Sequence, residues 1–200
     1  MGKWFPRIYD TAMKPLEKNK FNLIRKSLVE QAYGRVLEVG SGTGINFPYY
    51  KNVTRLDAIE PNPRMQEKAI PRVDDASIPI QTYTAGAEKL PFDDNTFDSV
   101  VATLVFCTIP DPVAALREIR RVAKPGARML FFEHVKMDQP ALAKAQSFMT
   151  PVWKQVCDGC HLDRDTLGLL QDSSLEILKI NRYYRGLFLS IVVNNQPISY

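Results

Sequence analysis

A glycine-rich segment follows an apolar stretch near the start of the chain, and it limits the possible folds more than any other feature. Arg35–Val39 has the apolar, β-branched character of a strand, and Gly40, Gly42 and Gly44 follow it at once. A strand that turns this tightly into the next element needs glycine, both for unusual φ angles and for close approach of a ligand to the backbone. The sequence therefore predicts a ligand-binding loop at the carboxyl end of the first strand of an α/β sheet.

The rest of the chain alternates short apolar runs with helical patterns, which favours parallel βαβ units. Further strands are predicted at residues 55–59, 78–84, 97–105 and 127–135, followed by a terminal hairpin over residues 175–181 and 187–193. Helices are predicted at residues 16–32, 64–69, 112–122 and 139–171, the last broken near residues 158–159. Five alternating units and a hairpin describe an open sheet with one antiparallel strand, for which 200 residues in one domain are enough.

The composition is that of an ordinary globular protein, with 45% apolar and 24% charged residues. No apolar run reaches the roughly 18 residues that span a bilayer. The first residues also lack the apolar stretch and cleavage site of a secretory signal. Three cysteines, an odd number in a chain of this size, do not indicate a disulfide framework. We therefore expect a cytoplasmic protein without a membrane-spanning helix.

Basic charge is concentrated in residues 1–35, which contain eight Lys and Arg side chains and three acidic ones. This segment suits peripheral contact with an anionic membrane surface or an anionic substrate, and it is also the pattern of a solvated helix face. Beyond it no basic surplus remains to track phosphates, so no nucleic-acid partner is expected. The sequence does not indicate an oligomeric state.

Two carboxylates are predicted near the ends of the first two strands. Glu60 follows Gly40 by 20 residues and ends the second strand, where an acidic side chain can accept hydrogen bonds from both ribose hydroxyls. It could instead serve as an acid at a helix N-terminus ahead of Pro61. Ile45 stands where a dinucleotide fingerprint would have its third glycine, which weakens the alternative of a dinucleotide-dependent oxidoreductase. Glu38 places a carboxylate beside the loop, which suits the positive sulfonium of S-adenosylmethionine (SAM).

Four segments of the chain resemble the class I SAM-dependent methyltransferases of the methyltransferase domain 11 type: LEVGSGTG, AIEPNP, AEKLPFDDNTFDSVVA and LREIRRVAKPGARMLFFEH. The resemblance covers about residues 35–135 in order, and the quinone-biosynthesis and small-molecule branch is the most similar. It implies a Rossmann-like α/β fold with a mostly parallel seven-stranded sheet, order 3-2-1-4-5-7-6, with strand 7 antiparallel and helices on both faces. It also implies SAM as the cofactor, S-adenosyl-L-homocysteine as its product and a small molecule as the substrate.

Carried over position by position, the resemblance implies which residues contact SAM. Those at its methionine end would be Glu38, Gly40, Ser41 and Gly42, and Glu60 would hold the ribose. Those near the adenine would be Pro61, Asn62 and Met65, joined after the third strand by Gly86, Ala87 and Glu88, where many relatives have aspartate in place of Gly86. Those near the methyl group would be Thr103 and Leu104, and Tyr9 would belong to an N-terminal lid.

The C-terminal third is similar to a narrower group, the methyltransferase-like thiol methyltransferases. The similarity rests on FFEHV, on a helix that contains Trp153 and on the segment DGCHLDRD, together with TLVFC at residues 103–107. It implies a thiol or another lipophilic molecule as the methyl acceptor. A quinone ring carbon and a phospholipid amine are the alternative acceptors, and a SAM-binding protein without catalysis is the alternative class.

Two histidines are candidates for a general base. His134 ends the fifth strand, at the sheet edge where ligands of open α/β folds bind, and His161 lies in a late loop. Either could take a proton from the acceptor, or could be a hydrogen-bonded structural residue. The segment from Cys157 to His161 also fits the c-type haem pattern. Nothing else in the sequence supports haem, zinc or another metal, so packing or lining of the acceptor pocket is the preferred interpretation.

These features together predict one SAM-dependent methyltransferase domain over residues 1–200. Residues 1–33 would form an N-terminal helical lid, and residues 34–135 the cofactor-binding core. Residues 136–200 would supply the substrate-side helices and the terminal β-hairpin.

Overall fold

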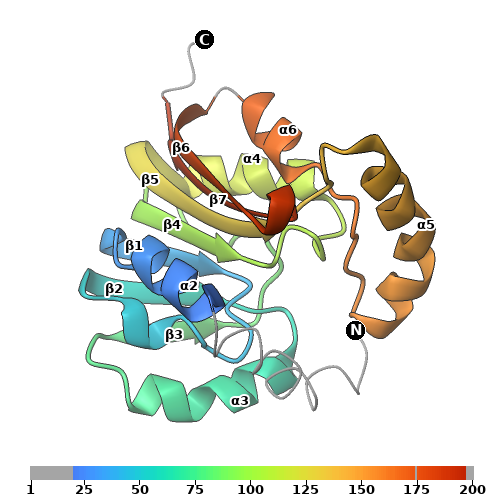
Figure 1. Cartoon of the computed structure of the whole chain (residues 1–200). Coiled ribbons are helices and arrows are strands. Elements are labelled where there is room, and N and C mark those ends of the chain that lie inside the picture. The colour runs from blue at the N-terminus through green and yellow to red at the C-terminus, as the bar shows by residue number, and fades with distance from the viewer. Residues whose placement is uncertain (1–19, 174, 197–200) are drawn as a thin grey trace.

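The computed structural model describes residues 20–173 and 175–196, and its centre is a seven-stranded sheet (Figure 1). The strand order is β3-β2-β1-β4-β5-β7-β6, with β7 antiparallel to both of its neighbours and the other pairs parallel. The order implied by the family resemblance is therefore confirmed. The strands are β1 (Tyr33–Val39), β2 (Asn52–Ile59), β3 (Ile80–Tyr83), β4 (Phe97–Thr103), β5 (Ala123–His134), β6 (Glu176–Tyr183) and β7 (Phe188–Asn194).

Helices flank the sheet in the described residues: α2 (Asn22–Val29), α3 (Pro63–Asp74), α4 (Pro112–Val122), α5 (Pro140–Val156) and α6 (Thr166–Gln171). Two short 3₁₀ turns, η2 (Phe47–Tyr49) and η3 (Tyr184–Gly186), complete the elements. α2 lies within the range predicted as helical at residues 16–32. The helix predicted over 139–171 is divided into α5 and α6. Within the described ranges, no helix is long and apolar enough to cross a membrane.

The sheet separates two apolar cores, one on each face. Along β5, Leu130 and Phe132 point into the core that α2 and α3 cover, whereas Met129 and Phe131 point into the core that α4 and α6 cover. This alternation is the two-residue period of a strand. A strand covered on both faces is apolar at every position, which is why β4 and β5 are continuous apolar runs in the sequence.

Several element boundaries differ from the sequence prediction, and two of the differences have a local cause. α3 continues beyond residue 69 through Pro71 and ends at Asp74. Pro71 is exposed, so water can satisfy the carbonyl group that its missing N–H leaves unpaired. β5 begins at Ala123 instead of residue 127. Gly126 adopts a φ of 77°, and the register between β4 and β5 shifts between Phe97 and Ser99, so the residues before 127 are included in the strand.

Asn195 ties the end of β7 to the connection between α4 and β5. Its side-chain Nδ2 donates hydrogen bonds to the backbone carbonyls of Arg120 (3.1 Å), Ala123 (2.9 Å) and Lys124 (3.2 Å). Its backbone N–H donates to the carbonyl of Ala127 at 2.9 Å. Because Asn195 is buried, removing its side-chain amide would leave the carbonyls of Arg120, Ala123 and Lys124 without this partner, away from water.

We therefore predict that Asn195→Ala lowers the free energy of unfolding by about 1–3 kcal/mol, the usual cost of leaving buried polar groups unsatisfied. Urea denaturation followed by circular dichroism would measure this loss. Asn194→Ala is the matched control, because the side chain of Asn194 makes one long hydrogen bond, to Glu176 Oε2 at 3.4 Å. We expect the control to lose no more than about 0.5 kcal/mol. Equal losses in the two variants would contradict the role given to Asn195.

Candidate cofactor and acceptor site

The loops that follow β1, β2 and β4 meet at one edge of the sheet. The N–H of Ser41 donates to the carbonyl of Ile59 (3.0 Å), which brings the glycine loop against the end of β2. The N–H of Leu104 donates to the carbonyl of Phe132 (2.7 Å), which holds the end of β4 against β5. This is the edge at which open α/β sheets bind their ligands. Three parts of the set assigned to the cofactor therefore lie at this edge: residues 38–42, Glu60 and residues 103–104.

Gly40 and Gly42 both adopt backbone conformations that other residues rarely take, with φ angles of 65° and 56°. A Cβ on Gly40 would lie 2.2 Å from Cγ2 of Val105, so only glycine lets the loop pass this close to the end of β4. A Cβ on Gly42 would lie 3.6 Å from Cε of Met65, which places the Met65 side chain beside the loop. The loop is thus held between β4 and α3.

Glu60 is buried at the end of β2 and faces the glycine loop. Its Oε2 accepts a hydrogen bond from the N–H of Gly42 (3.0 Å), and its Oε1 accepts one from the N–H of Asn62 (2.9 Å). Burial raises the pKa of the Glu60 carboxyl. A carboxylate has about four lone-pair sites, so two hydroxyl groups could still donate to it.

The residues after Glu60 have different environments. The Asn62 side chain accepts from the N–H of Arg64 (3.1 Å), so it caps α3. Pro61 is exposed, and Met65 is buried. Of these residues near the predicted adenine position, Met65 lies beside the loop. The side chain of Asn62 already accepts the hydrogen bond from Arg64.

Glu38 is the most enclosed carboxylate of the predicted cofactor set. It accepts hydrogen bonds from the hydroxyl of Tyr50 (2.7 Å) and from Nδ2 of Asn46 (2.9 Å). Burial raises the pKa of Glu38 to about 7 in spite of these hydrogen bonds. The Glu38 carboxyl can therefore exchange its proton near neutral pH.

Arg25 of α2 belongs to the same hydrogen-bond network as Glu38, through Asn46, and sequence reasoning did not identify it. Its Nη1 donates to Oγ1 of Thr103 (2.7 Å) and to Oδ1 of Asn46 (3.2 Å), and all three side chains are buried. A hollow opens over this network, bordered by Arg25, Gly40, Ser41, Gly42, Thr43, Ile45, Asn46 and Thr103. A cationic guanidinium and a titrating carboxylate therefore lie together beneath the glycine loop.

In the segment after β3, the Glu88 side chain turns back toward Gly86. A Cβ on Gly86 would lie 2.9 Å from Oε2 of Glu88, so the Glu88 carboxylate already occupies this space. Ala87, which lies between Gly86 and Glu88 in the sequence, is buried. At the end of β4, Leu104 is half-buried and has a φ of 55°. Tyr9 lies outside the described residues.

Two loops join beside this edge and bring cysteines together. The N–H of His161, after α5, donates to the carbonyl of Cys107, after β4 (2.8 Å). The Cys107 and Cys160 thiols are both free and lie close enough to interact, which raises the pKa of the buried Cys107 and lowers that of Cys160. Cys160 thus neighbours Cys107 from another loop as well as Cys157 in its own segment, so the cluster is not defined by the spacing between Cys157 and Cys160 alone. No three His, Cys, Asp or Glu side chains of the described chain are grouped so that they could hold a metal ion.

The two predicted bases are weak ones. His134 is buried, and its Nδ1 has no hydrogen-bond partner in the described structure. Burial lowers the pKa of His134 to about 4, and burial together with the positive charge of Arg164 lowers the pKa of His161. Asp163 lies close enough to affect both histidines. Both imidazoles are therefore neutral at pH 7 and can accept a hydrogen bond.

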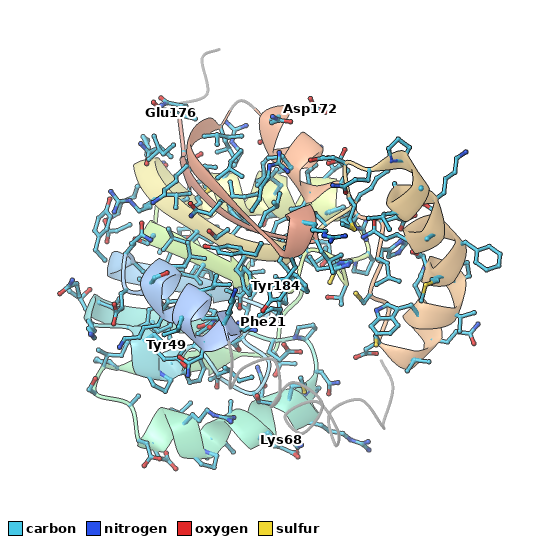
Figure 2. All side chains as sticks on the ribbon, in the orientation of Figure 1. Phe21, Tyr49, Lys68, Asp172, Glu176 and Tyr184 are labelled. Atoms are coloured by element: carbon cyan, nitrogen blue, oxygen red, sulfur yellow. The ribbon has the colours of Figure 1, made fainter. Side chains whose placement is uncertain are left out.

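An aromatic cluster lines the region beside His134, and the sequence analysis missed it. The ring of Phe188 lies 5.6 Å from His134 and 4.8 Å from Phe21, centroid to centroid. Phe21 also contacts the rings of Phe132 (5.2 Å) and Tyr184 (5.8 Å), and Figure 2 shows Phe21 and Tyr184 next to each other. The cluster joins α2, β5 and the turn between β6 and β7. The aromatic pair Tyr183-Tyr184 is the only local signal of it in the sequence of that turn.

Comparison with known sequences agrees with this geometry. The family described as methyltransferase domain matches residues 37–131. The chain is 30% identical to thiol S-methyltransferase TMT1A of Homo sapiens over 189 residues, which cover 89% of this chain and 78% of that protein. It is 35% identical to thiol S-methyltransferase TMT1B of Rattus norvegicus over 136 residues, which cover 66% of this chain. The match spans about half the length of the rat protein (55%).

Solved structures show the same fold. A SAM-dependent methyltransferase from Aquifex aeolicus superimposes with a TM-score of 0.61 at 19% identity, over 92% of this chain and 97% of that one. The strand order, the loop at the carboxyl end of β1 and the family match all agree. The chain therefore belongs to the class I SAM-dependent methyltransferases.

Proposed function

We propose that this chain transfers the methyl group of SAM to the sulfur of a small lipophilic thiol. The observation that carries the proposal is the pair of neutral histidines, His134 and His161, of which His134 lies against Phe188 of the aromatic cluster. Neither is a strong base, which suits an acceptor that ionises by itself. A thiol has a pKa near 8.5, well below that of an alcohol. The thiol S-methyltransferases among the relatives support the same acceptor.

The cofactor roles are proposed on the geometry of the loop. Glu60 would accept the ribose hydroxyls, and the backbone of Gly40, Ser41 and Gly42 would line the methionine end. Arg25 would bind the methionine carboxylate, because its guanidinium borders the hollow beside these residues. Further members of this proposed site are Glu38, Pro61, Asn62, Met65, Gly86, Ala87, Glu88, Thr103 and Leu104, with Tyr9 in a lid formed by residues 1–33.

SAM supplies an electrophilic methyl group that passes to the acceptor sulfur as the sulfonium C–S bond breaks. The acceptor thiol would lose its proton to water before transfer. The neutral ring of His134 would donate an N–H hydrogen bond to the thiolate and orient it, and the aromatic cluster would hold the apolar part of the acceptor away from water. Positioning of this kind supplies most of the rate enhancement in a direct displacement. His161 would serve the same purpose from the neighbouring loop.

Glu60→Ala is predicted to weaken SAM binding. The variant loses charge-assisted hydrogen bonds worth about 1.5–3 kcal/mol, which correspond to a roughly 10- to 150-fold higher Kd. Isothermal titration calorimetry with SAM would measure it, and thermal denaturation would establish that the variant is folded. Glu67→Ala, on an exposed position of α3, is the matched control and should bind as the unmodified chain does. An unchanged Kd in a folded Glu60→Ala variant would remove Glu60 from the ribose site.

SAM affinity is predicted to rise with pH up to about 7. Without SAM, burial holds the pKa of Glu38 at about 7, so the carboxyl is largely protonated at lower pH. The positive sulfonium and ammonium of SAM favour the charged carboxylate, so binding below this pH releases a proton. Affinity should therefore increase by at most about tenfold per pH unit below 7 and level off above it, up to the titration of the SAM α-amino group near pH 8.

Calorimetry in buffers with different ionisation enthalpies would count the protons released on binding. In Glu38→Gln, which cannot ionise, this proton release and the associated pH dependence should disappear. The α-amino group of SAM also titrates near pH 8, and the Glu38→Gln variant retains that contribution. The same proton release in both proteins would assign the titration to another group.

The acceptor is tested by transfer of labelled methyl from SAM to three substrates: a small alkyl thiol, a quinol precursor and phosphatidylethanolamine vesicles. We expect the label in the thioether, and a lower yield with His134→Ala because the acceptor is less well oriented. Label in the quinol precursor or the lipid, with none in the thiol, would overturn the proposed acceptor. SAM binding without label in any of the three would support a SAM-binding protein without catalysis.

A further inference from the structure

α5 stands at the edge of the molecule on the side to which the parallel strands point (Figure 1). Its two buried residues, Gln146 and Thr150, are polar. Nε2 of Gln146 donates to the carbonyls of Val135 (3.0 Å) and Leu162 (2.9 Å), and Oγ1 of Thr150 contacts Oδ1 of Asp163 at 3.1 Å. α5 is therefore attached to the rest of the chain through its polar side.

The opposite side of α5 is apolar and faces outward. Phe148 is 87% exposed and Val152 is 69% exposed, and Leu142, Met149 and Val156 are exposed as well. At 3.6 residues per turn these five side chains share one face, with small alanines between them. Surface helices ordinarily bury their apolar face. A contiguous exposed apolar face of this kind marks an interaction surface.

The charge of α5 indicates what this face contacts. The charged residues of the helix are Lys144 and Lys154, both exposed, and the helix contains no Asp or Glu. Asp138, just before the helix, is paired with Arg182 at 3.0 Å. At 3.6 residues per turn Lys144 flanks the apolar face beside Phe148, whereas Lys154 lies on the other side of the helix. An apolar helix face flanked by lysine, on a helix without acidic residues, is complementary to a bilayer that carries anionic headgroups.

We propose that α5 docks on an anionic lipid surface, with Phe148 and Val152 inserted at the boundary between headgroups and acyl chains. Lys144 lies one turn before Phe148, and its long side chain can reach the headgroup level while the apolar face is inserted. The helix lies in the plane of the surface and does not cross it.

Docking here would place the lipid next to the acceptor side of the site. Trp153, in the last part of α5, lies close enough to Cys160 to lower the pKa of its thiol, and Cys160 in turn neighbours Cys107. A lipophilic acceptor dissolved in the bilayer would then have a short path to the sheet edge. This use of the surface depends on the proposed function, but the docking itself does not.

The test is co-sedimentation of the full chain, without SAM or acceptor, with phosphatidylcholine vesicles that contain or lack phosphatidylserine. We expect binding that increases with phosphatidylserine and decreases with salt. Phe148→Ser combined with Val152→Ser should bind at least about tenfold more weakly, because the inserted apolar area is lost. Lys144→Gln should weaken the preference for phosphatidylserine, whereas Lys154→Gln, on the other side of the helix, should leave it unchanged.

Ile70→Ser combined with Val113→Ser is the matched control, because both side chains are 55% exposed but lie on α3 and α4. We expect it to bind like the unmodified chain, and thermal denaturation should show all variants folded. Absence of vesicle binding by the unmodified chain would overturn the proposal. So would equal binding by the Phe148/Val152 variant, which would place the lipid contact elsewhere in the chain. A dimer that forms without lipid and is lost in this variant, with no vesicle binding, would assign the face to a second copy.

Discussion

The buried carboxylate of Glu38 is the constraint on which the cofactor region depends. A charge or polar group taken out of water costs several kcal/mol unless it is hydrogen-bonded. Tyr50 and Asn46 provide these bonds, and both lie in the segment that follows the glycine loop. Satisfying Glu38 therefore folds this segment back against β1, and Asn46 in turn connects to Arg25 of α2. The hollow beneath the loop has its shape because one carboxylate at the end of β1 requires partners.

The parts of this arrangement that depend on local pattern could be predicted from the sequence. Strand periodicity and the glycine spacing place Gly40 and Glu60 at one edge of the sheet, since the carboxyl ends of parallel strands meet there. The role of Arg25 could not be predicted, because it bonds to Thr103, 78 residues away, and in the sequence it is one more basic position on a helix. Contacts of this length follow from how α2 packs, which no short segment encodes.

The histidines show a second limit of sequence reasoning. The position of His134 at the end of β5 follows from the strand pattern, but its protonation does not. That depends on burial beside Phe188, which reaches the site from the terminal hairpin. In the same way, the short spacing between Cys157 and Cys160 attracts attention in the sequence, yet the structure also brings Cys107, more than 50 residues earlier, next to Cys160. Residue type and spacing identify candidates, and burial decides what chemistry each can perform.

The orientation of α5 extends this argument to the surface. Its apolar period alone would assign Phe148 and Val152 to the core. The helix is instead rotated by its polar contacts, because Gln146 satisfies two backbone carbonyls from segments that border the acceptor side. Those buried carbonyls would otherwise lack a partner, and that cost fixes which face of α5 points outward. The same hydrogen bonds that hold the loops of the proposed acceptor side in place therefore also expose the apolar face of α5, so one interaction affects both.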